Sequence, residues 1–213
     1  FNQSGTALTA AVRSATAGPV PIGHGGWVAG KTDDVDGEID EAALGAKPWL
    51  NASRAVRSLI VCEAGLVIPT ALTARMYFFG FGDAETGGAD DDGMLAITTA
   101  TTLVSGATGD AAGFVYSSEA TDADGFYMGA VKATAVGTAV LAGADGSLDT
   151  VAVDNYLKLR VEADADGDVY FFGVEDLGTA NRRIKPVYIG SQAAAITADI
   201  LYFPIFSAAS TTT

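Results

Sequence analysis

The chain has 213 residues, of which 49% are hydrophobic, so it is long enough and apolar enough to bury a substantial core. It carries 26 acidic against 12 basic residues, a net charge of −14 at pH 7. A field of that sign repels phosphate backbones, so nucleic acid is not an expected partner. Its apolar runs are short and fall well below the roughly 18 residues that span a bilayer, so no membrane association is expected either.

Residues 1–26 differ in composition from the rest of the chain. They are rich in Gly, Ser, Thr and Ala, contain Pro19 and Pro21, and show no persistent helical or strand period. We predict an extended N-terminal arm that is ordered by contact with a partner, followed by a single domain over residues 27–213. His24 lies in this arm and is the one histidine of the chain, which favours a loop residue over a ligand.

Short apolar runs of strand length follow, separated by Gly/Asp-rich turns such as TDADG. They lie at residues 57–64, 74–81, 98–104, 113–116, 126–132, 138–141, 185–190 and 197–206. Pro204 predicts that the last run ends there or lies at a sheet edge. Helical patterns are weak, and residues 38–44 (EIDEAAL) are the one stretch that could form a turn or two of helix. Many short strands at this spacing predict an all-β, antiparallel β-sandwich.

The clearest local pattern is residues 156–172 (YLKLRVEADADGDVYFF). Apolar residues alternate with polar ones from Tyr156 to Ala163, which places one strand face on a core and the other toward water. Residues 164–168 (DADGD) then supply a turn, and residues 169–172 return as a second strand. The stretch predicts a β-hairpin.

Two segments resemble a known family. Residues 113–132 (GFVYSSEATDADGFYMGAVK) and residues 156–172 are similar to the concanavalin A-like jelly-roll domains of tailed-phage virion proteins, and residues 75–84 (RMYFFGFGDA) resemble an upstream strand of that family. The resemblance covers roughly residues 55–203. Residues 173–176 (GVED) depart from it, because the family places an Asn-Gly or Asp-Gly turn there.

The resemblance implies a jelly-roll fold and a non-enzymatic structural protein at the surface of a phage particle, as a capsid decoration or head-fibre subunit. Its partners would be the capsid or other virion proteins, and further copies of itself, for instance in a trimer that buries open sheet edges. The alternative is a carbohydrate-binding, lectin-like adhesin on a phage tail or cell surface, with a glycan as partner.

One acidic stretch mimics a catalytic motif of β-jelly-roll glycosidases. Glu38, Asp40 and Glu41 nearly reproduce a Glu-x-Asp-x-Glu pattern, but position 42 is Ala. A retaining glycosidase needs two carboxyl groups about 5–5.5 Å apart, and residues at an odd spacing point to opposite faces of a strand. We therefore expect a solvated acidic loop here and no catalytic residues in the chain.

A second acidic stretch mimics a calcium loop. Residues 162–167 (EADADG) begin like an EF-hand, but the twelfth position, which must supply a bidentate carboxylate, is Gly173. A hairpin turn is favoured, and neither a metal nor a cofactor is expected. A weakly held ion at Asp122 and Asp124, or at residues 90–92, remains an alternative.

The remaining candidates have structural interpretations. Cys62 is the one cysteine and lies in an apolar run, so we expect a buried thiol. Trp27, Trp49, Tyr127 and Tyr156 could stack on sugars, but core or interface positions are favoured for them.

Overall fold

The structure of the protein is a computed structural model. It describes residues 10–12, 20–21, 28–29, 39–43, 50–51, 59–67, 72–73, 75–83, 95–99, 102–105, 109–118, 120, 125–133, 137–142, 148, 152, 156–176, 186–198 and 200–210. These residues contain strands and no helix, and the strands pair antiparallel. The predicted all-β, antiparallel fold is confirmed.

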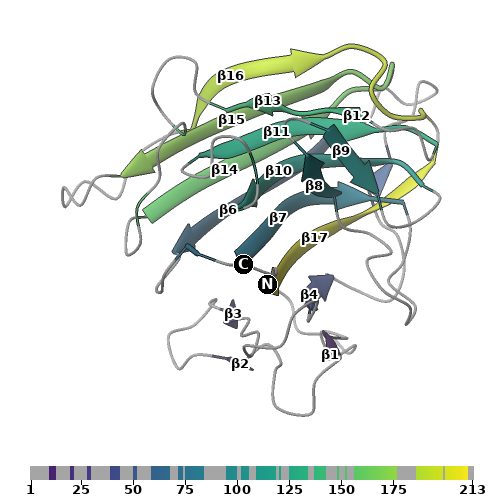
Figure 1. Ribbon diagram of the computed structural model, residues 1–213. Helices are drawn as coiled ribbons and strands as arrows, with labels where there is room; N and C mark the ends of the chain where they lie inside the picture. Colours follow the sequence, from purple (N-terminus) through teal and green to yellow (C-terminus); the bar gives the residue numbers. More distant parts are fainter. Residues whose placement is uncertain are drawn as a thin grey trace.

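The largest sheet of the described residues has eight strands, in the order β1-β4-β17-β7-β10-β11-β13, with β5 also beside β17 (Figure 1). Their bounds are β1 Ala10–Val12, β4 Ile39–Ala43, β5 Leu50–Asn51, β7 Arg75–Gly82, β10 Ala111–Ser117, β11 Phe126–Val131, β13 Val140–Leu141 and β17 Leu201–Ser210.

The other described strands form smaller sheets. A four-stranded sheet runs β16 (Val187–Gln192), β15 (Val169–Asp176), β14 (Tyr156–Ala163) and β6 (Ile60–Val67). A three-stranded sheet runs β12 (Gly137–Thr138), β9 (Thr102–Ser105) and β8 (Leu95–Thr99), and β2 (Val20–Pro21) pairs with β3 (Val28–Ala29).

The main core lies between the eight-stranded and four-stranded sheets, which makes the molecule a β-sandwich. Alternate residues of β14 (Leu157, Leu159, Val161 and Ala163) point inward and are fully buried, as the sequence alternation predicted. They meet alternate residues of β10 and β11. The rings of Phe114 and Phe171 cross edge to face between the sheets, with centroids 5.6 Å apart.

A second core covers the opposite face of the large sheet. Leu95, Ile97 and Leu103 of the three-stranded sheet pack there on Phe78 and Val115. Strands β10 and β11 are therefore buried on both faces. This explains why their sequences are continuously apolar rather than alternating.

Close packing of this second core depends on glycine. Gly113 of β10 pairs with Gly129 of β11, so neither strand carries a side chain at that point. A Cβ on Gly129 would lie 2.3 Å from Leu103, and one on Gly113 would lie 2.4 Å from Phe78. Gly129 lets Leu103 of the covering sheet lie directly on β11, and Gly113 leaves room for the Phe78 ring of the neighbouring strand β7.

The predicted strands are confirmed with shifted ends, with two exceptions. Residues 98–104 are not one strand: β8 and β9 pair with each other, and Thr99 pairs with Thr102, so the chain reverses between them. Residues 138–141 likewise divide at Ala139, between β12 of the three-stranded sheet and β13 of the large sheet. The Thr-rich composition predicted extended backbone but contained no signal for the reversal.

Pro204 is neither at a sheet edge nor at a strand end, so that prediction is wrong. Strand β17 continues to Ser210 and lies between β7 and β4. On one flank its described partners are β5, as far as Tyr202, and β4, from Ile205 onward. Pro204 falls at the junction between those two partners, where a missing N–H donor is tolerated.

The described part of the acidic stretch, residues 39–43, is neither a loop nor a helix. Ile39–Ala43 forms β4, in which Ala42 pairs with Ala10 of β1 on one side and with Phe206 of β17 on the other. Pairing on both sides overrides the local preference of Glu and Ala for helix.

Part of the predicted arm is also extended and paired, through β1 on β4 and β2 on β3. The boundary between residues 26 and 27 stays a prediction.

Candidate functional surface

The outer face of the four-stranded sheet carries the most organised group of polar and aromatic side chains among the described residues. Side chains alternate between the two faces of a strand, so the residues that lie between the buried ones of β14 face outward. They are Tyr156, Lys158, Arg160 and Glu162. Glu63 of β6 and Phe172 of β15 lie directly opposite Arg160 on the two neighbouring strands. Tyr188 of β16 lies opposite Phe172.

These four positions make one row across the sheet, Glu63–Arg160–Phe172–Tyr188, which we call the cross-strand row. Arg160 Nη1 lies 3.3 Å from Glu63 Oε2, and the guanidinium carbon lies 5.8 Å from the centre of the Phe172 ring. The Tyr188 ring meets Phe172 edge to face at 5.6 Å. Ion pair, cation–π contact and ring contact thus follow each other from edge to edge.

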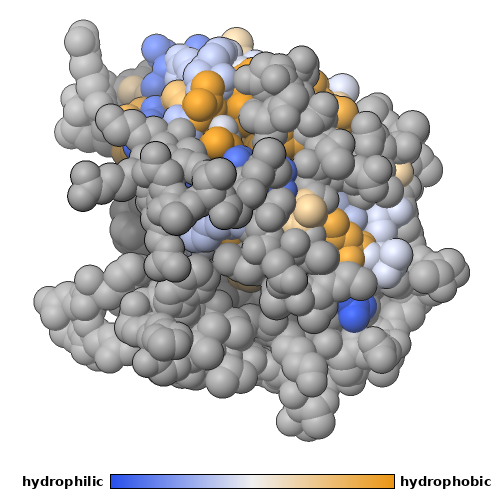
Figure 2. Space-filling model, turned by 90° about the vertical axis from the view of Figure 1, so that its left-hand side faces the viewer, coloured by the Kyte–Doolittle hydropathy of each residue, from blue (hydrophilic) through white to orange (hydrophobic). Residues whose placement is uncertain are grey.

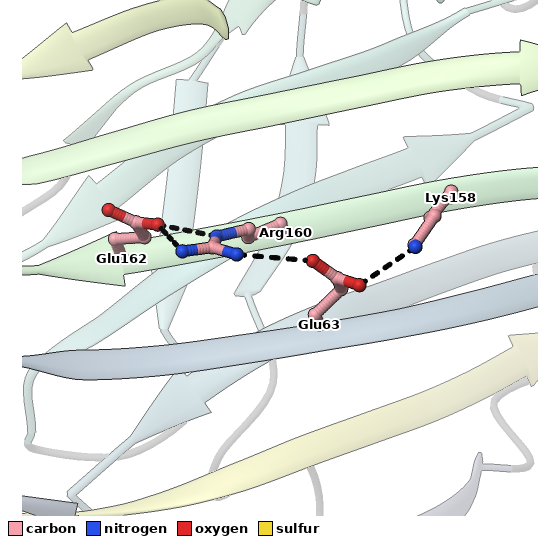
Figure 3. A network of polar contacts seen from close by, with 4 residues as sticks. All are labelled: Glu63, Lys158, Arg160 and Glu162. Carbon is pink, nitrogen blue, oxygen red and sulfur yellow. Dashed lines mark hydrogen bonds and ion pairs between the residues drawn. The ribbon is translucent and has the colours of Figure 1, made fainter. Parts of the chain in front are cut away.

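Two further charged groups complete this surface (Figure 3). Lys158 Nζ lies 2.9 Å from the second oxygen of Glu63, and Arg160 also donates from Nε to Glu162. Burial raises the pKa of Glu63, but hydrogen bonds from Lys158 and Arg160 and the charges of both outweigh it and lower the pKa overall. These two acidic and two basic side chains neutralise one another, so both cations that the described part of this surface contains are ion-paired.

The suspected calcium loop is a hairpin turn, as expected. Asp164 Oδ1 accepts the backbone N–H groups of Asp166 and Asp168, and Asp164 Oδ2 accepts the hydroxyl of Tyr170. That hydrogen bond raises the pKa of Tyr170. Gly167 adopts a positive φ of 84°, which the turn requires. The Asp164 carboxylate therefore caps the turn itself.

A buried carboxylate joins several elements at one end of the sandwich. Asp110, 3% exposed, accepts from the backbone N–H of Ala133 at 2.6 Å, from the N–H of Thr197 and from the Tyr202 hydroxyl at 3.2 Å. Its own N–H donates to Asp83 Oδ1 at 2.8 Å. Burial raises the pKa of Asp83, and repulsion from Asp110 adds to the rise. We call this group the Asp110 corner; its bonds are those of a structural anchor.

The structure assigns the aromatic and thiol candidates to different places. Tyr127 belongs to the second core and is buried, whereas Tyr156 lies on the outer face with its hydroxyl over Gly65. Cys62 is buried, as expected, and burial raises its pKa to about 12. Trp27 and Trp49 lie outside the described residues.

The remaining acidic and basic candidates are only partly placed. Asp40 and Glu41 belong to β4, whereas Glu38 lies outside the described residues. His24, residues 90–92, Asp122 and Asp124 also lie outside them. Within the described part of the chain, no three His, Cys, Asp or Glu side chains are grouped so that they could hold a metal ion.

The cross-strand row and the Asp110 corner were not found from the sequence. Alternation in residues 156–163 placed Arg160 toward water, but its partner Glu63 lies 97 residues away along the chain. Thr197 is similarly 87 residues from Asp110. Single-sequence patterns contain no signal for such distant pairings.

Comparison with known proteins adds no assignment. No protein-family model matches the chain, and no curated protein matches it significantly in sequence. The described residues also include no helix with the length and apolarity needed to cross a membrane.

Proposed function

We propose that the protein is a non-enzymatic structural protein of a tailed-phage particle, a capsid decoration or head-fibre subunit at the particle surface. It would bind the capsid or other virion proteins and further copies of itself. The concanavalin A-like jelly roll implied by residues 113–132 and 156–172 is part of this proposal.

One observation carries the proposal. The two segments with the family resemblance form β10–β11 and β14–β15, and they pack on each other ring to ring through Phe114 and Phe171. The two segments thus contribute many of the side chains of the main core. The carboxylates of Asp110, Asp164 and Glu63 support the same reading, because each is bonded to backbone or to a base.

Mass spectrometry of purified phage particles tests this assignment. Particles from a culture whose phage genome encodes the chain should contain its peptides in many copies, in a fixed ratio to the major capsid protein. Its absence from the particles would end the proposal. Turnover of a β-glucan that disappears in Glu38→Gln would separately overturn the non-enzymatic assignment.

A second candidate, glycan binding, is favoured by the cross-strand row. Tyr188 is 52% exposed at the end of the row, where a sugar ring could stack on it beside charged groups. A glycan array with and without calcium tests this, with Tyr188→Ala as the variant. Val187→Ala is the matched control, because Val187 is equally exposed on the same strand. Blank arrays, or an equal loss of glycan binding in both variants, would exclude glycan binding through Tyr188 and leave the structural role as the one proposed function.

A further inference from the structure

The edges of the described sheets are protected unequally. An open edge presents unpaired N–H and C=O groups, and proteins guard such edges with short strands, bulges, proline or charge. Strands β1 and β13, at the ends of the large sheet, have three and two residues. Strand β8, at one edge of the three-stranded sheet, has a register shift, and β12, at its other edge, has two residues.

The two edges of the four-stranded sheet differ most clearly. Strand β16 follows Pro186 directly, and its register with β15 shifts between Phe171 and Phe172. Strand β6, at the other edge, has eight residues, contains no proline and keeps an unbroken register with β14 from Ile60 to Val67. Among the described strands β6 pairs with β14 alone, so alternate residues direct backbone groups away from the sheet. Edge β6 lacks the protection that the other edges have.

The side chains of β6 also favour contact over solvation. Leu59, which directly precedes the strand, and Val61, on its outer face, are 52% and 39% exposed. Figure 2 shows hydrophobic residues beside hydrophilic ones on the coloured part of the surface that it presents. The one charged residue of the strand, Glu63, is neutralised by Lys158 and Arg160. An edge strand normally carries a free charge as a guard, and here that charge is compensated.

We propose that β6 is an assembly edge, at which it pairs antiparallel with β6 of a second copy of this chain about a two-fold axis. The pairing would join two four-stranded sheets into one continuous sheet. This pairing rests on the proposed function, because it would be the contact through which copies of the chain associate. A dimer with a two-fold axis takes the place of the trimer considered from the sequence.

Two features favour a second copy as the occupant. The strand is apolar at both ends, with Leu59 and Val61 at one end and Leu66 and Val67 at the other. Antiparallel self-pairing centred on Glu63 would place Leu59 opposite Val67 and Ile60 opposite Leu66, so apolar residues meet at both ends of the paired strands. The two Glu63 residues would then lie opposite each other, each already paired with Lys158 and Arg160 of its own copy. The chain also carries a net charge of −14, so two copies repel each other overall. Beside β6 the described acids Glu63 and Glu162 are paired with Lys158 and Arg160, which reduces the repulsion between two copies at this edge.

The protected edge at β16 limits the assembly to pairs. If β6 of one copy paired with β16 of the next, each added copy would leave another free edge at the end of the assembly, and the product would be an open-ended filament. Proline and the register shift at β16 oppose that arrangement. A closed dimer is the expected product.

Sedimentation velocity on the full chain across a concentration series tests the proposal, with Val61→Lys as the disrupting variant. Val140→Lys is the matched control, because Val140 is 45% exposed on β13 and the charge change is the same. We expect a monomer–dimer equilibrium for the wild type and the control, and a monomer at every concentration for Val61→Lys. A monomeric wild type, a filament, or equal behaviour of the two variants would overturn the proposal.

Hydrogen exchange on the wild type provides a test that requires no variant to fold. Outward-facing amides of β6 should become slower to exchange as the concentration rises, whereas those of β16 should not change. Unchanged exchange in β6 would refute the pairing even if dimers form, and it would leave the virion assignment to be decided by the particle analysis.

Discussion

Removing the buried carboxylate of Asp110 should destabilise the protein measurably. Asp110→Ala leaves the backbone N–H groups of Thr197 and Ala133 without this acceptor, whereas the Tyr202 hydroxyl keeps the carbonyl of Thr197 at 2.7 Å. An orphaned buried donor costs about 1–3 kcal/mol. Water reaches the exposed Ala133, so its N–H costs less. We expect the free energy of unfolding to fall by about 2–4 kcal/mol. For a chain of this size, each kcal/mol lowers Tm by about 2–4 °C.

Urea unfolding followed by circular dichroism measures that loss. Asp110→Asn should lose less than the alanine variant, because its carbonyl oxygen still accepts one of the two N–H groups. Asp83→Asn is the control, because it neutralises the neighbouring carboxylate but keeps an acceptor for the Asp110 N–H. A loss below about 0.5 kcal/mol for Asp110→Ala, or an equal loss for Asp83→Asn, would refute the role of the Asp110 corner as an anchor.

Three further outcomes are expected. Because burial raises the pKa of Cys62 to about 12, its thiol should react with iodoacetamide at pH 8 only as fast as the chain unfolds; rapid labelling of folded protein would contradict this. The pKa of Glu63 in the folded protein is lowered from its ordinary value of 4.5. Its ion pairs therefore stabilise the fold above pH 4.5, and this stabilisation is lost as the pH falls through the lowered pKa. Wild type should accordingly lose up to about 1 kcal/mol relative to Glu63→Gln in acid urea titrations, and parallel curves would exclude the effect. Gly113→Ala should destabilise the fold by about 1–3 kcal/mol or more, because the added Cβ would lie 2.4 Å from a backbone oxygen. Gly190→Ala is the control and should destabilise it less, because its Cβ meets the flexible end of a methionine. Equal losses of stability in thermal unfolding would be inconsistent with this packing.

Local patterns predicted much of the fold because they report on faces and turns. The alternation from Tyr156 to Ala163 specified which side chains would be buried, since a strand in a two-layer structure has one dry face. Asp164 and Gly167 specified the hairpin turn, since a side-chain acceptor and a positive φ are available within five residues. The sandwich followed from the number and spacing of such strands.

Tertiary pairing decided the features that the sequence predicted wrongly or not at all. Ile39–Ala43 became a strand because β1 and β17 supply partners on both sides, although its own residues favour helix. Pro204 was tolerated inside a sheet because it falls between two partner strands.

The candidate surface depended on tertiary structure in the same way. The residues of the cross-strand row were present in the sequence as an outward Arg160 and a distant Glu63, but register alone brought them to 3.3 Å. The sequence by itself therefore determined which residues of β14 are buried and where the hairpin turns. The tertiary structure decided which strands are neighbours, because hydrogen bonding between strands is selected by the whole sheet and carries no local sequence code.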